Sequence, residues 1–138
     1  MLTTDLIIIG AGPGGYETAL LAARRGLSVA LIERGEVGGT CLNEGCIPTK
    51  ALCRTAAMVS DFAEAEAFGI KDVAFTLDFP TVMERKRTVV KQLRDGVESL
   101  ISNPNIHLLR GEARFVDALT VEAAGERVTA KDVIIATG

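Results

Sequence analysis

Residues 5–33 read DLIIIGAGPGGYETALLAARRGLSVALIE, and this stretch decides the fold. Its two short apolar runs, 5–10 and 28–33, are typical of buried parallel strands. The residues between them repeat apolar side chains at helical spacing until Gly26, a residue type that commonly ends a helix. A strand, a helix and a second strand within about 30 residues predict a βαβ unit with a right-handed crossover. We therefore expect an α/β fold built on a parallel sheet.

The turn between the first strand and the helix, residues 10–15, has the glycine pattern G-x-G-x-x-G. In this setting the first glycine permits a tight turn, the second lets the backbone approach a pyrophosphate, and the third lets the helix pack closely on the strand. The helix N-terminus then directs backbone N–H groups at phosphate oxygens. The residues of this turn that we expect at a dinucleotide are Gly10, Gly12, Pro13, Gly14 and Gly15.

Glu33 closes the second strand, where such folds carry an acid that binds a ribose. A surface acid at the end of a strand is the plainer interpretation of the same residue. With the strand, the helix and the acid all in place, the stretch predicts a Rossmann-like dinucleotide-binding unit. The pattern alone does not separate FAD from NAD, because both cofactors use it.

Two long helices are expected after this unit. The first covers residues 48–65, with Pro48 tolerated in its first turn, and residues 61–79 after it are expected to be largely irregular. From Pro80 onward, apolar residues repeat on one face of a second helix. Its opposite face is expected to be a solvated basic surface, formed by Arg85, Lys86, Arg87, Lys91 and Arg94.

Strands are expected again in the last third of the chain. Residues 105–111 predict a third strand, and the alternating residues 113–130, with a turn at Gly125, predict a small antiparallel meander. Residues 132–138 predict a last buried strand. Because such a strand normally leads into another ligand-facing loop, we expect residues 1–138 to be the front part of a larger protein.

Composition narrows the class of protein. The 138-residue chain carries a net charge of −3, with 48% hydrophobic and 24% charged residues, which is typical of a folded domain with a core of its own. The lack of a basic bias argues against a nucleic-acid partner, and the apolar runs are too short to span a membrane. No leader is evident, so we expect a cytoplasmic location, in which lasting structural disulfides are rare.

Residues 38–50, GGTCLNEGCIPTK, hold two of the three cysteines. In a straight helix, residues five apart have α-carbons roughly 8.6 Å from each other, whereas a disulfide requires about 4.4–6.8 Å. Cys41 and Cys46 can therefore bridge only across a turn, which Asn43 and Gly45 would tolerate. The loop so closed is small, which favours a readily reduced, working disulfide over a structural one. Cys46 begins the predicted helix, where the N-terminus favours a thiolate.

The sequence gives less support to other roles for Cys41 and Cys46. A zinc site needs about four ligands, and Cys53 and His107 stand at no recognised spacing, so no metal site is expected. Two unpaired core cysteines stay possible on spacing alone. Cys53 itself is expected in the core of its helix, and His107 is expected to be structural.

Taken together, the glycine turn, Glu33 and GGTCLNEGCIPTK resemble the flavin-dependent pyridine nucleotide–disulfide oxidoreductases. The resemblance spans the whole chain, and the cysteine segment is highly specific to this family. Within the family, the Ile-Pro-Thr-Lys ending resembles the branch that oxidises dihydrolipoamide more than the branches that reduce glutathione disulfide or mercuric ion.

The resemblance implies that the glycine turn holds FAD. Cys41 would be the interchange thiol that meets the substrate, and Cys46 the thiolate that faces the flavin. Dihydrolipoamide, alone or on a lipoyl-bearing protein, would reduce the disulfide, and its electrons would pass by way of FAD to NAD. The further cofactor-binding residues implied are Glu33 and Arg34 at the ribose, Gly38, Gly39 and Thr40 along the pyrophosphate, Lys50 near the reactive ring, Ala113 at the adenine, and Ala136, Thr137 and Gly138 beside the flavin.

Members of this family are several times longer, so the chain would be the N-terminal part of an FAD-binding domain. The NAD-binding and dimerisation domains, and a His-Glu acid–base pair, would lie outside it, and the full-length protein would be a homodimer. The 138 residues alone are expected to be inactive and to hold FAD weakly. Glu44 departs from the family, because it places a negative charge between the two cysteines where the family often has an apolar residue. A non-redox dinucleotide-binding module and a thiol-based redox sensor stay open as alternatives.

Overall fold

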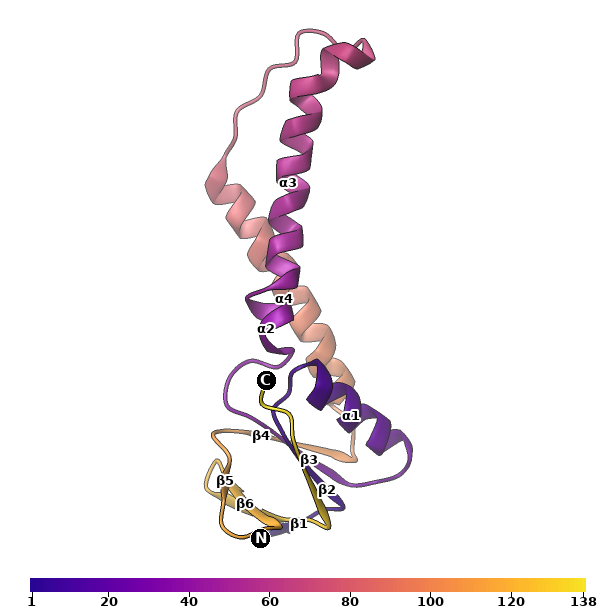
Figure 1. Ribbon diagram of the computed structural model, residues 1–138, viewed down its shortest axis with the longest axis vertical. Coiled ribbons are helices and arrows are strands. Elements are labelled where there is room, and N and C mark those ends of the chain that lie inside the picture. Colours follow the sequence, from indigo (N-terminus) through magenta and orange to yellow (C-terminus); the bar gives the residue numbers. More distant parts are fainter.

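The computed structural model describes all 138 residues and confirms the α/β fold (Figure 1). A four-stranded, fully parallel sheet lies at its centre. In spatial order its strands are β4 (Ile106–Arg110), β3 (Val29–Glu33), β2 (Leu6–Ile9) and β8 (Asp132–Ile135). α1 (Pro13–Arg24) connects β2 to β3, which pairs beside it, and this completes the predicted βαβ unit.

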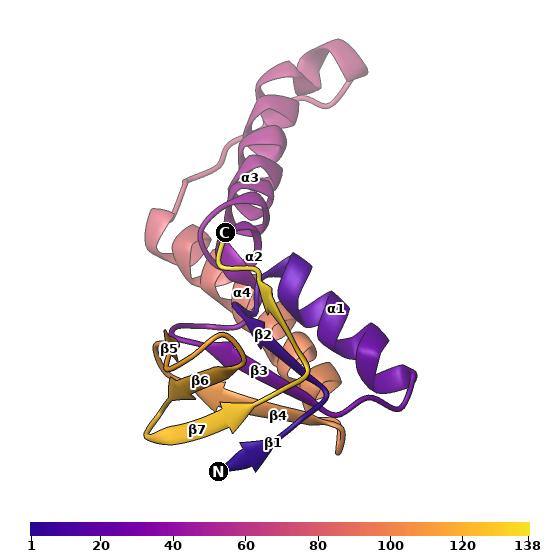
Figure 2. The ribbon, with the colours of Figure 1, turned by 60° about the horizontal axis from the view of Figure 1, so that its bottom comes forward.

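The two central strands are buried because a different layer covers each face of the sheet. On one face, Ile8 and Leu31 pack with α1 and α4 (Phe79–Ile101) in a cluster of 15 buried residues. On the other face, Ile7 and Ile32 belong to a cluster of 8 buried residues shared with a second sheet. Successive side chains of a strand point to opposite faces, so a continuous apolar run supplies both clusters. Figure 2 shows the three layers: helices, parallel sheet and small second sheet.

The second sheet contains the predicted meander. β5 (Arg114–Phe115), β6 (Thr120–Ala123) and β7 (Glu126–Thr129) pair antiparallel, and Gly125 makes the turn between the last two with a φ of 78°. β1 (Leu2–Thr3) adds a parallel strand to β7. This last pairing brings residues 2–3 beside residues 128–129, and no local sequence pattern predicts it.

Two long helices form an arm that projects from the sheets (Figures 1 and 2). α3 (Cys46–Glu64) packs along α4 and is prolonged by the 3₁₀-helix η1 (Ala65–Phe68). The expectation that residues 61–79 are irregular is therefore wrong for its first half, because the chain meets no helix breaker before Gly69, which has a φ of 79°. No helix of the structure is both long enough and apolar enough to cross a membrane.

Residues 132–138 do not form the buried strand that their sequence predicts. β8 lies at the edge of the parallel sheet and pairs only with β2. As a result Ile134 is 37% exposed and Ile135 is 66% exposed. The prediction of a strand is confirmed for residues 132–135, but an edge position leaves part of each side chain uncovered.

Candidate functional site

The glycine turn joins β2 to α1 at the carboxyl edge of the parallel sheet. Gly10 has a φ of 103°, a conformation that favours glycine. Gly12 is the N-cap of α1 and Pro13 its first residue, and no side chain caps the helix. The N-terminus of α1 therefore presents its backbone donors to the space in front of the sheet, where an anion can accept from them.

Glu33 ends β3 next to this turn and is bonded to the backbone on both sides. Its Oε2 accepts a hydrogen bond of 2.7 Å from the N–H of Ala11, and its Oε1 accepts one of 2.8 Å from the N–H of Gly35. A carboxylate oxygen can accept more than one hydrogen bond. Glu33 thus holds the glycine turn beside the end of β3 and keeps acceptor capacity for a hydroxyl group.

We call residues 34–45, between β3 and α3, the cysteine loop. Within it, Gly38 and Gly39 have φ values of 100° and 68°, and they lead into the short helix α2 (Gly39–Asn43). The Nδ2 of Asn43 donates to the carbonyls of Val37, at 2.9 Å, and of Gly39, at 3.0 Å. These bonds fold the loop onto itself before α3 begins.

The cysteine loop packs directly on the glycine turn. A β-carbon at Gly39 would lie 2.8 Å from the α-carbon of Gly12 and 3.2 Å from the Cδ of Pro13. Such distances are too short for any side chain, so the two segments approach as bare backbone. Gly39 is therefore required by its contact with the glycine turn, whereas a β-carbon at Gly12 would lie an ordinary 3.7 Å from the α-carbon of Gly39.

Cys41 and Cys46 form a disulfide, with α-carbons 4.7 Å apart. Cys41 belongs to α2 and Cys46 is the first residue of α3, whose N-cap is Gly45. The prediction that a bridge requires a break in the helix is confirmed, because Gly45 separates the two helical segments. Cys53 is free and exposed on α3, and not in the core as expected.

One cavity of about 810 Å³ brings the two motifs together. The sequence-predicted residues that line it are Gly10, Gly12, Pro13, Gly14, Glu33, Arg34, Gly39, Thr40, Cys41, Ala136, Thr137 and Gly138. The ends of β2, β3 and β8 thus meet α2 at one place, and both figures show the C-terminal residues beside α2 (Figures 1 and 2).

Five predicted residues do not line this cavity. Gly15 and Gly38 lie behind it, where a β-carbon would collide with Gly10 and with Leu42, respectively. Lys50 is exposed on α3. Ala113 is half-buried against the cluster under the second sheet.

The fifth residue is Cys46, which is exposed, whereas its partner Cys41 is half-buried and lines the cavity. In this chain the exposure of the two cysteines is thus opposite to the expected order, so their assignment to flavin and substrate stays a prediction.

Four further residues line the cavity without having been predicted: Gly35, Glu36, Asn43 and Glu44. Gly35 and Glu36 follow Glu33 in sequence, and Asn43 and Glu44 lie between the cysteines. Their position between predicted site residues was the available signal, but no motif gives these residue types a role.

Comparisons with known proteins agree with these motifs. The family model described as pyridine nucleotide-disulphide oxidoreductase matches residues 4–138. A dihydrolipoyl dehydrogenase from Thermus scotoductus is 47% identical over 138 residues, covering 100% of this chain and 30% of that protein. One from Chlamydia muridarum is 44% identical over 137 residues, covering 97% of this chain and 30% of that protein. The chain thus spans 30% of the length of these relatives.

Among solved structures, the Cu(II) complex of the HOCl-induced flavoprotein disulfide reductase RclA from Escherichia coli superimposes with a TM-score of 0.79. It is 31% identical in sequence, and the match covers 100% of this chain and 29% of that one. The whole chain therefore shares its fold with the corresponding part of a flavoprotein disulfide reductase.

Proposed function

The chain belongs to the pyridine nucleotide-disulphide oxidoreductase family, and from this premise we propose that it forms the FAD-binding, disulfide-bearing part of a dihydrolipoyl dehydrogenase. The observation that carries the proposal is that Cys41, bridged to Cys46, lines the same cavity as the glycine turn. A dinucleotide bound at the turn and a reducible sulfur would then share one space. The relatives of 44% and 47% identity support the choice of branch within the family.

The residues of the cavity fit FAD. The uncapped N-terminus of α1 suits a pyrophosphate, and the bare-backbone contact of Gly12 with Gly39 leaves the approach to it free of side chains. Glu33 would accept from a ribose hydroxyl. When bound, FAD supplies two-electron transfer between a dithiol and NAD. Lys50 and Ala113 belong to this proposal by resemblance alone.

The chain's own part in the reaction is thiol–disulfide exchange. A thiolate of dihydrolipoamide attacks the sulfur of Cys41, the Cys41–Cys46 bond breaks, and Cys46 departs as a thiolate. The second substrate thiol then displaces Cys41 from the mixed disulfide. The substrate leaves as a cyclic disulfide, both cysteines are reduced, and the two thiol protons pass to solvent. Gly45 lets the two sulfurs belong to separate helical segments, so that the loop can open without unwinding α3.

The proposal is tested with serine variants in the full-length protein purified with its flavin. Cys41→Ser and Cys46→Ser should each lower dihydrolipoamide oxidation by about 10³-fold or more, as expected for residues that act as one unit. Cys53→Ser is the matched control and should retain activity. Full activity of Cys41→Ser would show that the reaction does not use the disulfide, whereas a wild-type protein that binds flavin but does not oxidise dihydrolipoamide or reduce its disulfide would favour a non-redox dinucleotide-binding module. Rapid reduction of the wild-type disulfide without NADH formation would favour a redox sensor.

Substrate tests separate the branches of the family. Assays with dihydrolipoamide and NAD, and with NADPH and either glutathione disulfide or mercuric ion, should give turnover only with the first pair. Turnover with either of the others would overturn the assignment to the lipoyl branch.

We further propose that the full-length protein is a homodimer. The far end of the arm supports this, since it exposes several large apolar side chains of the kind that an association surface buries. Examples are Phe68, 78% exposed, and Phe79, 59% exposed. Sedimentation of the full-length protein should give twice the mass of one chain, and a monomer at micromolar concentration would contradict the proposal.

A further inference from the structure

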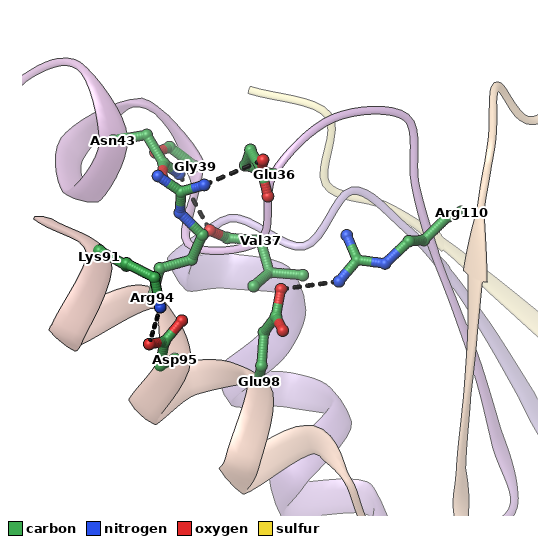
Figure 3. Close-up of polar contacts among 9 residues, drawn as sticks. All are labelled: Glu36, Val37, Gly39, Asn43, Lys91, Arg94, Asp95, Glu98 and Arg110. Carbon is green, nitrogen blue, oxygen red and sulfur yellow. Dashed lines mark hydrogen bonds and ion pairs between the residues drawn. The ribbon is translucent and has the colours of Figure 1, made fainter.

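The basic face expected on α4 is not uniformly solvated. Lys91 and Arg87 have side chains that are 71% and 62% exposed, and each pairs with an acid on its own helix. Arg94 has a side chain that is only 26% exposed, and its Nη1 lies 2.9 Å from the Oε1 of Glu36. Figure 3 shows the guanidinium of Arg94 directed toward the cysteine loop. The prediction that Arg94 faces solvent is therefore wrong.

The contact of Arg94 with the cysteine loop is partly buried and imperfectly satisfied. The Nε of Arg94 is buried without a hydrogen-bond partner, and so is the Oδ1 of Asn43 in α2, which packs against α4. A buried polar atom without a partner costs free energy, and such atoms in a native structure call for an explanation. A fully solvated arginine on α4 would avoid this cost, so the position of Arg94 is not explained by the stability of α4 itself.

What Arg94 reaches is the outer end of the segment that carries the chemistry. Glu36 lines the cavity, and Val37, next to it, is fully buried and accepts a hydrogen bond from Asn43. Gly39 then packs on the glycine turn, and Cys41 follows within α2. Because this segment is tightly folded, a displacement of Glu36 would also displace the parts of the loop that contact the glycine turn and carry the disulfide.

Resting on the proposed function, we propose that Arg94 is a positioning residue for the redox disulfide. By pairing with Glu36 it holds the cysteine loop against the glycine turn, and in doing so it sets both how firmly FAD is retained and how readily the Cys41–Cys46 bond is reduced. With Arg94 in place, Cys41 is kept beside Cys46, which favours the oxidised pair. Without the Arg94–Glu36 ion pair the cysteine loop is more mobile, and this favours the reduced form, in which the two sulfurs are separate.

The fold offers a matched control. Arg110, on β4, pairs with Glu98, on α4, at 2.7 Å, and Figure 3 shows this pair near the first. Both ion pairs link α4 to another element, but neither Arg110 nor Glu98 lines the cavity of the glycine turn. Comparing Arg94→Met with Arg110→Met therefore separates the loss of an ion pair made by α4 from the loss of control over the cysteine loop.

The experiment uses the full-length protein purified with its flavin. The oxidised fraction of Cys41–Cys46 is measured by alkylation and mass spectrometry in buffers of defined dihydrolipoate-to-lipoate ratio, and flavin release is followed by its fluorescence. Arg94→Met should shift the exchange equilibrium toward the dithiol about threefold, which is about 14 mV for this two-electron couple. It should also speed flavin release severalfold. Arg110→Met should change neither quantity.

Two further variants guard against a merely unfolded protein. Glu36→Gln should reproduce both effects, and adding it to Arg94→Met should change little more, because the two residues act through one contact. Arg94→Lys keeps the charge and should restore most of both. Equal behaviour of Arg94→Met and Arg110→Met would overturn the proposal. A wild-type protein that fails to oxidise dihydrolipoamide would overturn the proposed function instead, while the equilibrium and the release rate would still decide the role of Arg94.

Discussion

Gly15, in the first turn of α1, lies directly against the backbone carbonyl of Gly10, so a β-carbon at Gly15 would overlap the Gly10 oxygen. This contact lets the helix start close to the strand that precedes it. Gly15→Ala should therefore lower the free energy of unfolding by at least about 2 kcal/mol, since the backbone must shift to make room. Urea denaturation measures the loss. Gly14→Ala is the control: nothing lies within 4 Å of a β-carbon there, and an equal loss in both variants would contradict the argument.

Substitution of Gly39 should weaken flavin binding, for a steric reason similar to the one that makes Gly15 necessary for folding. Its φ of 68° and the 2.8 Å approach to Gly12 both exclude a β-carbon. Gly39→Ala should displace the cysteine loop from the glycine turn at a cost of about 1–3 kcal/mol and lower the flavin content of the purified full-length protein. The ratio of flavin to protein absorbance measures this. Gly96→Ala is the control: Gly96 lies in α4 outside the cavity, and nothing lies within 4 Å of a β-carbon there, so its flavin content should stay near that of wild type.

Glu33 should matter to stability before any ligand is considered. Both of its oxygens accept from backbone N–H groups, those of Ala11 and Gly35. Glu33→Gln keeps one acceptor but turns an NH₂ group toward the other donor, which should cost about 1–2 kcal/mol, because the unpaired N–H is partly shielded from water. Thermal unfolding measures this. Glu64, exposed at the end of α3, is the matched site, and Glu64→Gln should leave the unfolding midpoint unchanged.

Local sequence patterns were sufficient for the core of this fold. The run Leu6–Ile9, the glycine turn and the run Val29–Glu33 are consecutive, and each is defined by the residues within it. The cysteine pair was equally local, since the spacing of Cys41 and Cys46 allows a bridge only across a break in the helix, and Gly45 provides that break. For such features the chain's own periodicity and turn residues decide the structure.

Features that depend on distant partners could not be predicted in this way. The pairing of β1 with β7 and the edge position of β8 are set by strands far away in sequence. Arg94 has the same spacing as solvated neighbours on α4, and it is half-buried because the cysteine loop, with Glu36, packs against this part of α4. Glu36 and Asn43 likewise line the cavity because of how the cysteine loop folds, and no local sequence motif predicts that they do.

Asp5 should make stability depend on pH. Hydrogen bonds from the Lys131 ammonium and from the backbone and hydroxyl of Ser28 hold the pKa of the Asp5 carboxyl well below its usual range. Because the folded-state pKa is depressed, the stabilisation is complete above the unfolded pKa of about 3.9 and is lost as the pH falls through the folded value. Asp5→Asn should thus unfold at a lower temperature than wild type at pH 7.

This difference between Asp5→Asn and wild type should narrow below about pH 4, where the unfolded carboxyl is protonated. The same bond raises the pKa of Lys131, so its contribution is present at neutral pH and is lost only as the pH rises through that raised value. Asp61→Asn, on the exposed face of α3, is the control and should track wild type throughout. A difference that stayed constant from pH 7 to pH 2 would show that the carboxylate charge is not the cause.

Gly45 should tune the disulfide without removing either sulfur. A β-carbon at Gly45 would lie 3.1 Å from the carbonyl oxygen of Thr40 and 3.3 Å from the α-carbon of Cys41. The bridge holds these groups together in the oxidised form, whereas the reduced loop can relax away from them. Gly45→Ala should therefore disfavour the disulfide, making its reduction potential less negative by about 10–30 mV, which corresponds to about 0.5–1.4 kcal/mol. Alkylation in dihydrolipoate and lipoate buffers measures the shift.

Gly69→Ala is the control for this prediction. Gly69 lies at the end of the arm, away from the cavity, and its substitution should leave the reduction potential unchanged. A more negative potential in Gly45→Ala would mean that the contact with Thr40 persists in the reduced form and does not resist closure of the bridge.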